Sequence, residues 1–208
     1  MKQKILIGLA LILALAAGVY LSIHIAPPSG PQYASLYPQP REIPDFALIN
    51  QHGETFGKEA LRGKWTLAFT GYTFCPDICP TTLAELKGIY PQLQQISPDI
   101  QVLFLSVDPN RDTTERLLEY VNFFEPAFIA ATAEHKELFP FVRSLGMMYA
   151  MSESTDNPDY LVDHSSSLTI INPQAQVVGR FKPTLAPGQM AVVNPQQILA
   201  DMPVIIGR

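Results

Sequence analysis

The sequence predicts an α/β domain that follows one apolar segment at the N-terminus. Short apolar runs typical of buried strands alternate with segments whose apolar residues recur at helical spacing. A pair of strands and a last helix then complete the pattern. The chain has 208 residues, of which 47% are hydrophobic and 16% are charged, which suits one domain of ordinary size.

Residues 1–26 are predicted to form a membrane anchor. The run Ile5–Ile25 carries no charged side chain. A helix of about 21 residues at 1.5 Å per residue spans about 30 Å, the thickness of a bilayer's hydrocarbon core. Lys2 and Lys4 precede the run, and no Lys or Arg follows before Arg41. The positive-inside rule therefore predicts a cytoplasmic N-terminus and a body on the other side.

A cleaved signal peptide is the alternative, with Ala14-Leu15-Ala16 as its small-residue site. The apolar run is longer than the apolar region of about 7 to 15 residues found in signal peptides, which favours the anchor. The short basic start lacks the Arg- and Ser-rich character of a mitochondrial presequence. We therefore expect a single-pass protein of a bacterial inner membrane, with its C-terminal domain in the periplasm.

A proline-rich segment, residues 27–43, is predicted to be a tether between the anchor and the domain. Six prolines lie between Pro27 and Pro44. Prolines favour extended polyproline conformations of roughly 3.1 Å per residue, so the tether could hold the domain up to about 50 Å from the membrane. A disordered linker fits the same composition.

The domain is assigned to residues 44–208. A hairpin is predicted over residues 43–56, with a turn at 51–53. The apolar run at residues 64–71 then has the character of a buried central strand, and the first cysteine follows its carboxyl end. A helix comes next and ends before Pro98; its apolar positions are Leu83, Leu86, Ile89, Tyr90 and Leu93.

Two further strand and helix pairs are predicted. A strand at residues 101–108 precedes a helix that Asp112 and Glu115 would open as a capping box. An apolar run at 127–131 precedes a helix from a Thr132 cap to Leu145.

A hairpin and a helix close the predicted domain. Strands at 165–171 and 176–181 would be joined by a turn at 172–175. Asn194 and Pro195 would then open the last helix. This order, with a cysteine pair where the first central strand meets its helix, is the thioredoxin arrangement.

Cys75 and Cys79 are the only cysteines in the chain, and a proline follows each. Because proline disfavours helix in the residue before it, both are predicted in an extended loop, with Pro80 at the first helical position. The helix N-terminus would favour the thiolate form of both sulfurs. A structural disulfide, a redox couple and a metal site are all compatible with this placement.

These three interpretations differ in how well they suit the chain. A disulfide across so short a loop would contribute only about 2 kcal/mol. Thioredoxin-type redox couples have two residues between the cysteines, whereas Pro76, Asp77 and Ile78 make three here. Two thiolates are a soft pair suited to Cu(I), and imidazole is a compatible third ligand.

Four histidines are candidates for that third ligand. His24 falls in the anchor, His52 in a polar turn, and His135 on the exposed face of a predicted helix. His164 leads into a strand that could border the central one. On spacing alone, a single histidine of this kind is more often structural or merely exposed.

Three stretches together resemble the Sco/SenC family of copper-binding proteins, which help assemble the copper centre of cytochrome c oxidase. The resemblance covers about Pro44 to Pro183, and its stretches are YTFCPDICPTTL, LFLSVDPNRDTTERLLEYVNFF and DYLVDHSSSLTIINPQAQVVGRF. It implies a thioredoxin-like fold on a membrane anchor. It also implies that Cys75, Cys79 and His164 bind copper, as Cu(I) or Cu(II).

The function expected from this resemblance is that of a copper chaperone. Its partners would be a copper donor protein and the copper-bearing subunit of cytochrome c oxidase. The alternative is a thiol-disulfide oxidoreductase, with Cys75 and Cys79 as a redox pair that keeps the target's cysteines reduced. Whether the protein is an enzyme is left open by the sequence. We expect a monomer.

Two other classes of function are disfavoured. A net charge of −5 gives no basic surface for nucleic acid. The entry hairpin resembles that of peroxiredoxins, which have Thr or Ser three residues before the reactive cysteine. Tyr72 and Pro76 hold those positions here.

Further side chains near the motifs have secondary roles. Asp77 could tune the charge of the site or form a turn, and Asp163 should point away from His164 if that segment is extended. A cap or turn role is expected for Asp108. Three methionines are expected to be flexible apolar cover, with copper entry as the alternative: Met147, Met148 and Met151.

Overall fold

The computed structural model describes residues 2–25, 30–151, 157, 159–185, 188 and 190–207. The chain divides into two units, residues 1–30 and residues 31–208.

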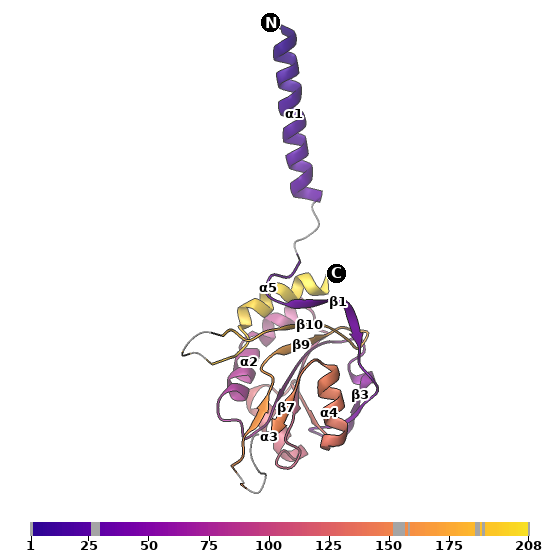
Figure 1. Ribbon diagram of the computed structural model, residues 1–208, viewed down its shortest axis with the longest axis vertical. Coiled ribbons are helices and arrows are strands. Elements are labelled where there is room, and N and C mark those ends of the chain that lie inside the picture. The colour runs from indigo at the N-terminus through magenta and orange to yellow at the C-terminus, as the bar shows by residue number, and fades with distance from the viewer. Residues whose placement is uncertain are drawn as a thin grey trace. The chain divides into compact units, whose positions relative to one another are not determined.

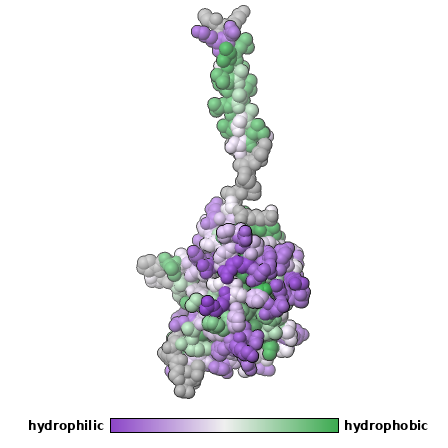
Figure 2. Space-filling view, turned by 45° about the vertical axis from the view of Figure 1, so that its right-hand side comes forward, coloured by the Kyte–Doolittle hydropathy of each residue, from purple (hydrophilic) through white to green (hydrophobic). Residues whose placement is uncertain are grey.

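The first unit is one helix, α1 (Lys2–Ile25). Within it, Gln3–Ser22 is long and apolar enough to cross a membrane, and none of that stretch is buried against other parts of the protein. Figure 2 shows this helix as a largely apolar surface. A signal sequence meets the same criterion of length and composition, so the anchor of residues 1–26 stays a prediction.

The second unit is built on a mixed sheet of eight strands (Figure 1). The central strands β4, β5 and β6 are parallel to one another, and β9 and β10 continue the sheet in antiparallel fashion. In spatial order the strands are β1 (Ser35–Glu42), β10 (Gln176–Phe181), β9 (Leu168–Ile171), β4 (Trp65–Gly71), β5 (Ile100–Ser106), β6 (Ile129–Thr132), β2 (Ala47–Asn50) and β3 (Thr55–Gly57).

Helices cover both faces of this sheet. One core lies under α2 (Ile78–Ile96), α3 (Thr114–Phe124) and α5 (Pro195–Ile206). The other lies under α4 (His135–Ser144), beside the short 3-10 helix η1 (Lys58–Ala60). Alternate residues of the central strands face alternate cores, because strand side chains point to opposite sides of a sheet. The thioredoxin-like α/β class is confirmed.

The strands and helices predicted around the central sheet are present. The β2–β3 hairpin pairs Leu48 with Phe56. The strand after His164, β9, borders the central strand β4 as expected. The Asn194 side chain caps α5 by accepting a hydrogen bond from the Gln196 backbone N–H, with Pro195 in the first turn.

The caps predicted for the two middle helices are wrong. α3 is capped by Thr113, whose hydroxyl accepts from the Arg116 backbone N–H, while Asp112 is buried elsewhere. α4 begins after Glu134, because Thr132 is the last residue of β6 and donates its hydroxyl to the Ser106 carbonyl. In both cases the residue that local spacing assigned to a helix cap instead forms a buried hydrogen bond with another part of the fold.

The proline-rich tether of residues 27–43 is also corrected, because its second half belongs to the sheet. β1 (Ser35–Glu42) pairs with β10 across an irregularity in register between Leu36 and Arg41. Proline is tolerated on an edge strand at positions whose N–H needs no partner. The second unit starts at residue 31 rather than at 44.

A second, two-stranded sheet lies outside the predicted elements. It pairs β7 (Tyr149–Met151) with β8 (Val162–His164) in antiparallel fashion, and Tyr149 lies opposite His164. This small sheet carries the histidine of the candidate site.

Candidate metal centre

The two cysteines lie where β4 passes into α2, at the carboxyl end of a central strand. Cys75 sits in the loop, and its backbone N–H donates to the Tyr72 carbonyl at 3.1 Å. Cys79 lies in the first turn of α2, which begins at Ile78. The helix thus starts two residues before Pro80, which corrects the expected boundary. Proline fits there because first-turn N–H groups have no partner within the helix.

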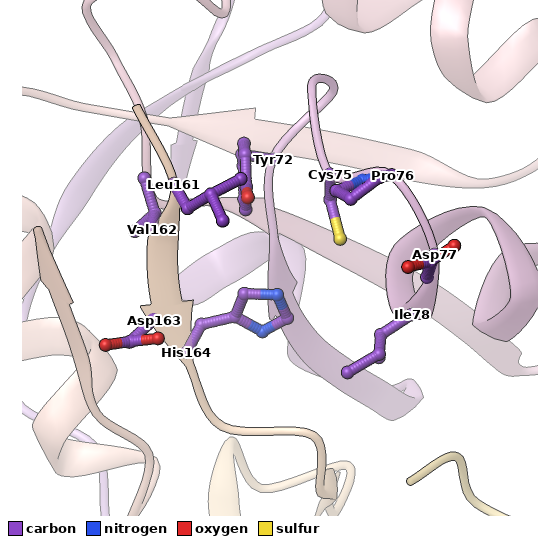
Figure 3. Close-up of a pocket in the computed structure, with 9 residues that line it drawn as sticks. All are labelled: Tyr72, Cys75, Pro76, Asp77, Ile78, Leu161, Val162, Asp163 and His164. Atoms are coloured by element: carbon purple, nitrogen blue, oxygen red, sulfur yellow. The ribbon is translucent and has the colours of Figure 1, made fainter. Parts of the chain in front are cut away.

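His164 reaches the cysteines from β8. Its Nε2 lies 3.4 Å from Cys79 Sγ, and the ligand atoms of Cys75, Cys79 and His164 all lie within 4.8 Å of one another. Figure 3 shows the Cys75 sulfur and the His164 ring turned toward the same space. Within the described part of the chain, these three form the one group of His, Cys, Asp or Glu side chains with the spacing to hold a metal ion.

The orientation of the His164 ring suits ligation through Nε2. Its other nitrogen, Nδ1, lies 3.2 Å from the Ser165 carbonyl oxygen. When Nδ1 carries the proton and donates it to that carbonyl, Nε2 keeps its lone pair for a metal or a thiol.

The two sulfurs differ in environment and therefore in charge. Both cysteines are free thiols; Cys79 is fully buried and Cys75 is half-buried. A hydrogen bond from the Cys79 side chain lowers the pKa of Cys75 from 9.0 to about 4, against the opposing effect of burial and with help from His164 and backbone N–H groups. The same interaction with Cys75 and burial raise the pKa of Cys79. At neutral pH the pair therefore shares one proton, with the thiolate on Cys75.

A cavity of about 210 Å³ opens beside Cys75 and His164. It is lined by residues of the cysteine loop and of β8: Tyr72, Cys75, Pro76, Asp77, Ile78, Leu161, Val162, Asp163 and His164. Asp77 and Asp163 are exposed at its edges. In Figure 3 the Asp163 carboxylate points away from the His164 ring, as expected for neighbours in a strand. The cavity gives a small ion or an incoming side chain access to Cys75.

The three methionines do not act as one group. Met147 is buried in the core, and Met151 is partly buried. Met148 is 64% exposed and lines a second cavity, of about 250 Å³, together with His164 and Asp163. Met147 is thus part of the apolar core, while Met148 lies beside a candidate ligand.

Among the histidines whose side chains the structure describes, only His164 belongs to the group with the cysteines. His24 is in α1, and its side chain lies outside the described part of the chain. His52 is in the turn after β2. His135, at the start of α4, is half-buried rather than exposed, because its Nδ1 lies 2.8 Å from the Tyr149 hydroxyl.

Two aspartates of the β5–α3 loop have roles that the sequence did not reveal. Asp108 is buried and forms an ion pair with Arg111, so it is more than a turn former. Asp112 accepts hydrogen bonds from the Thr73 N–H, the Thr73 hydroxyl and the Ser106 hydroxyl, at 3.0, 2.6 and 2.6 Å. Asp112 thereby ties the loop that carries Cys75 to the end of β5.

Gly71 is a further residue of the site, one that the sequence motifs did not single out. A Cβ at this position would lie 2.6 Å from Cys79 Sγ and 2.6 Å from Phe104 Cε2. Only a residue without a side chain leaves room for the buried sulfur. The sequence does contain an indication of this role, because a glycine at the end of a buried strand often marks a place where another group packs closely against the backbone.

Sequence comparisons identify relatives across most of the chain. A family model described as SCO1/SenC matches residues 35–195. A "Putative copper-binding protein" of Stutzerimonas stutzeri is 33% identical over 162 residues, which cover 77% of this chain and 79% of that protein. The "SCO2-like protein RP587" of Rickettsia prowazekii is 34% identical over 182 residues, which cover 86% and 88%.

Solved structures show the same fold. The crystal structure of Arabidopsis thaliana ScoI with copper bound has a TM-score of 0.67 and 31% identity, over 79% of this chain and 98% of that one. Apo Sco1 from Thermus thermophilus has a TM-score of 0.67 and 28% identity, over 86% and 96%. With its cysteine pair and distant histidine on this fold, the chain belongs to the SCO1/SenC family.

Proposed function

We propose that this protein binds copper through Cys75, Cys79 and His164 and delivers it to the copper centre of cytochrome c oxidase during assembly. The observation that carries the proposal is the convergence of two sulfurs and one imidazole nitrogen within 4.8 Å, beside an open cavity. A relative named as copper-binding and a related structure with copper bound support it.

The three donor atoms suit copper chemically. Two thiolates and one imidazole are soft and borderline ligands, which favour Cu(I). Cu(II) would take a further donor, such as water from the cavity. Binding releases the proton that the two thiols share, so affinity should fall with acidity.

Three protein ligands leave one side of the cargo ion open for exchange. Cys75 is the more exposed sulfur and is already a thiolate, so it is the ligand that an incoming thiolate can most readily replace. Cys79 and His164 would then release the ion as the acceptor's second ligand binds. One chain supplies all three ligands, so we infer that a monomer suffices.

The setting that we propose is the periplasmic face of a bacterial inner membrane, with α1 as an uncleaved anchor. The family's association with the oxidase supports the copper-bearing subunit of that enzyme as the acceptor. A copper donor protein would load the site. Both partners would approach the cavity between the cysteine loop and β8.

A second candidate function is thiol-disulfide exchange, which the Cys75 thiolate favours. The Cys75 thiolate would attack one sulfur of a target disulfide, which breaks that S–S bond, forms a mixed disulfide and releases the target's first thiolate. Cys79 would then lose its proton and attack the Cys75 sulfur, which releases the target's second thiolate. The target gains two electrons and the Cys75–Cys79 pair becomes a disulfide. In the mixed disulfide Cys75 is no longer a thiolate, so of the main effects that raise the pKa of Cys79 burial remains, and it opposes the second step because only the thiolate attacks.

A transfer assay separates the two functions. The copper-loaded full chain in detergent is mixed with the reduced soluble domain of the oxidase's copper-bearing subunit, and the apo chain is mixed with the same domain in its disulfide form. We expect copper to move in the first mixture, and His164→Ala to weaken copper binding strongly while the two cysteines still cycle between dithiol and disulfide. Fast reduction in the second mixture without copper transfer in the first would favour the reductase.

A further inference from the structure

We propose that Asp108, Arg111 and Tyr160 form a latch that positions His164 against the two cysteines. This inference rests on the proposed copper site and deepens it, because it assigns positioning residues to a ligand that the main sheet does not hold. The latch acts through the strand that carries His164.

The need for a latch follows from the topology. His164 is the last residue of β8, which pairs with β7 and with no strand of the eight-stranded sheet among the described residues. An isolated pair of short strands is marginally stable by itself. The place of His164 must therefore depend on contacts of β8 and its flanking residues with the rest of the domain, among them the buried Val162 side chain.

Tyr160 supplies the contacts before β8. It is 3% exposed, and its hydroxyl donates a hydrogen bond to the Asp108 carboxylate. The Arg111 guanidinium lies 3.6 Å from the centre of its ring, and Nη2 of Arg111 donates to the Tyr160 carbonyl at 2.9 Å. Ring, hydroxyl and backbone of this one residue are thus all held by the β5–α3 loop.

Arg111 joins the histidine side of the site to the cysteine side. Its guanidinium also lies 5.6 Å from the ring centre of Tyr72 and 4.7 Å from that of Phe74, the residue before Cys75. Asp108, which is fully buried, forms an ion pair with this guanidinium. A planar cation can stack on several rings while it is paired, which a lysine ammonium cannot do in the same way.

The other contacts of β8 are consistent with this arrangement. Beyond His164, the Ser165 carbonyl accepts from the Thr70 hydroxyl of β4 at 3.0 Å. The His164 ring lies edge-on to Tyr72, with ring centres 5.9 Å apart. Burial raises the pKa of the Tyr72 hydroxyl, against the effect of a hydrogen bond with the Val162 backbone. Tyr160 therefore fixes one end of a short segment, and Thr70 fixes the other.

The test is Tyr160→Phe in the full chain, which keeps the ring and removes the hydroxyl. Loss of such supporting contacts costs about 10- to 100-fold in metal affinity, so we expect Cu(II) to bind at least about 10-fold more weakly. The hyperfine coupling from the His164 imidazole nitrogen in the electron paramagnetic resonance spectrum of the Cu(II) protein should weaken as well. Arg111→Lys keeps a positive charge opposite Asp108 but loses the planar group that stacks on Tyr160, so it should also weaken Cu(II) binding.

The matched control is Tyr149→Phe, in the partner strand of the same small sheet. That hydroxyl contacts His135 rather than Asp108, so copper affinity should stay within about 2-fold of the wild type. An equal loss in this control would show that any disturbance of the hairpin has the same effect, and would overturn the latch.

A double-mutant cycle shows whether the latch acts through His164. If it does, Tyr160→Phe should cause no further loss of affinity in a His164→Ala background. If Tyr160→Phe weakened copper binding as much in the His164→Ala background as in the wild type, the proposal would be overturned. In the apo protein, nuclear Overhauser contacts between the His164 and Tyr72 rings should weaken in Tyr160→Phe. This last measurement needs no copper, so it tests the latch independently of the proposed function. A wild type that fails to bind copper would refute only the proposed function.

Discussion

At the scale of single residues, the two sulfurs are chemically unequal although they lie in one short motif. Cys75 is half-buried in a loop, and Cys79 is enclosed by the first turn of α2 and by Gly71. The shared proton therefore stays on the enclosed sulfur. Cys75 is the sulfur that partners and reagents should meet first.

This inequality predicts how alkylation depends on pH. The pKa of Cys75 is lowered from 9.0 to about 4, so its thiolate persists from neutral pH down toward pH 4. We expect iodoacetamide to modify Cys75 before Cys79, at a rate that is nearly flat between pH 8 and about pH 5, as the reactivity of the thiolate requires. A rate that rises about tenfold per pH unit from 6 to 8 would instead indicate an ordinary thiol.

Gly71 gives a second residue-scale prediction. In Gly71→Ala the new methyl group must displace Cys79 or Phe104, since each lies 2.6 Å from the site of the Cβ. We expect a loss of about 1–3 kcal/mol in the free energy of unfolding, as overpacked cores show, together with weaker copper binding. Denaturant titration and copper competition measure the two effects.

Gly88→Ala is the control for that substitution. Gly88 lies in α2, where a Cβ would meet no atom within 4 Å outside its own helical backbone, and alanine favours helix over glycine by about 1 kcal/mol. This variant should be as stable as the wild type or more so. If Gly71→Ala behaved in the same way, the close approach to Cys79 would be refuted.

Residue types and spacing in the sequence were enough to single out the two cysteine ligands but not the histidine. Cys75 and Cys79 follow from the motif itself, whereas His164 came from the family resemblance, because spacing alone left it undecided. Asp108 and Asp112 were expected to be turn and cap residues, since local patterns cannot show that a carboxylate is buried. Their tertiary partners lie far away in the sequence, on Tyr160 and Thr73.

At the scale of elements, the long apolar strands, the periodic helices and the β2–β3 hairpin were predictable, whereas β1, β7 and β8 were not. β4 and β5 are nearly continuous apolar runs that are buried on both faces, so their hydrophobicity predicts them. β7 and β8 have three residues each and no clear alternation. β1 contains two prolines, which favour a tether in any interpretation of local sequence.

The start of β7 gives an element-scale prediction about copper entry. Met148 precedes β7, is exposed, and shares a cavity with His164, whereas Met147 is buried. If a thioether assists entry, Met148→Leu should slow copper uptake in stopped-flow mixing while the final affinity stays unchanged. An unchanged uptake rate would leave Met148 as apolar cover.

Met147→Leu is the control, because that side chain is 1% exposed. Leucine replaces methionine in a core at little cost, so this variant should match the wild type in both uptake and stability. Slower uptake in both variants would point to a general effect on β7 instead of a ligand role for Met148.

At the scale of the whole molecule, Asp201 ties the two ends of the domain together. Its buried carboxylate in α5 accepts hydrogen bonds from the backbone N–H groups of Gln32, Tyr33 and Ala34, at 2.9, 2.7 and 2.7 Å. The ordered domain therefore includes residues just before β1. Fewer residues than predicted are left to act as a tether, so its covalent reach is shorter than about 50 Å.

Asp201→Ala should release that N-terminal segment. Three N–H groups would lose their partner, and we expect the free energy of unfolding to fall by about 2–4 kcal/mol. Limited proteolysis should then cut near residues 31–34. Asp163→Ala removes an exposed carboxylate and is the control, with a change within about 0.5 kcal/mol. An equally small change in Asp201→Ala would refute the role of this contact.

The central claim, that two sulfurs and one distant imidazole form a single copper site, is tested most directly by copper loading of the full chain and its His164→Ala variant. We predict one copper per wild-type chain and, with Cu(II), a thiolate-to-copper absorption band. The band should be lost in Cys75→Ser or Cys79→Ser, and affinity should fall strongly in His164→Ala but not in His52→Ala, which alters an exposed turn. Full copper affinity in His164→Ala would contradict the account.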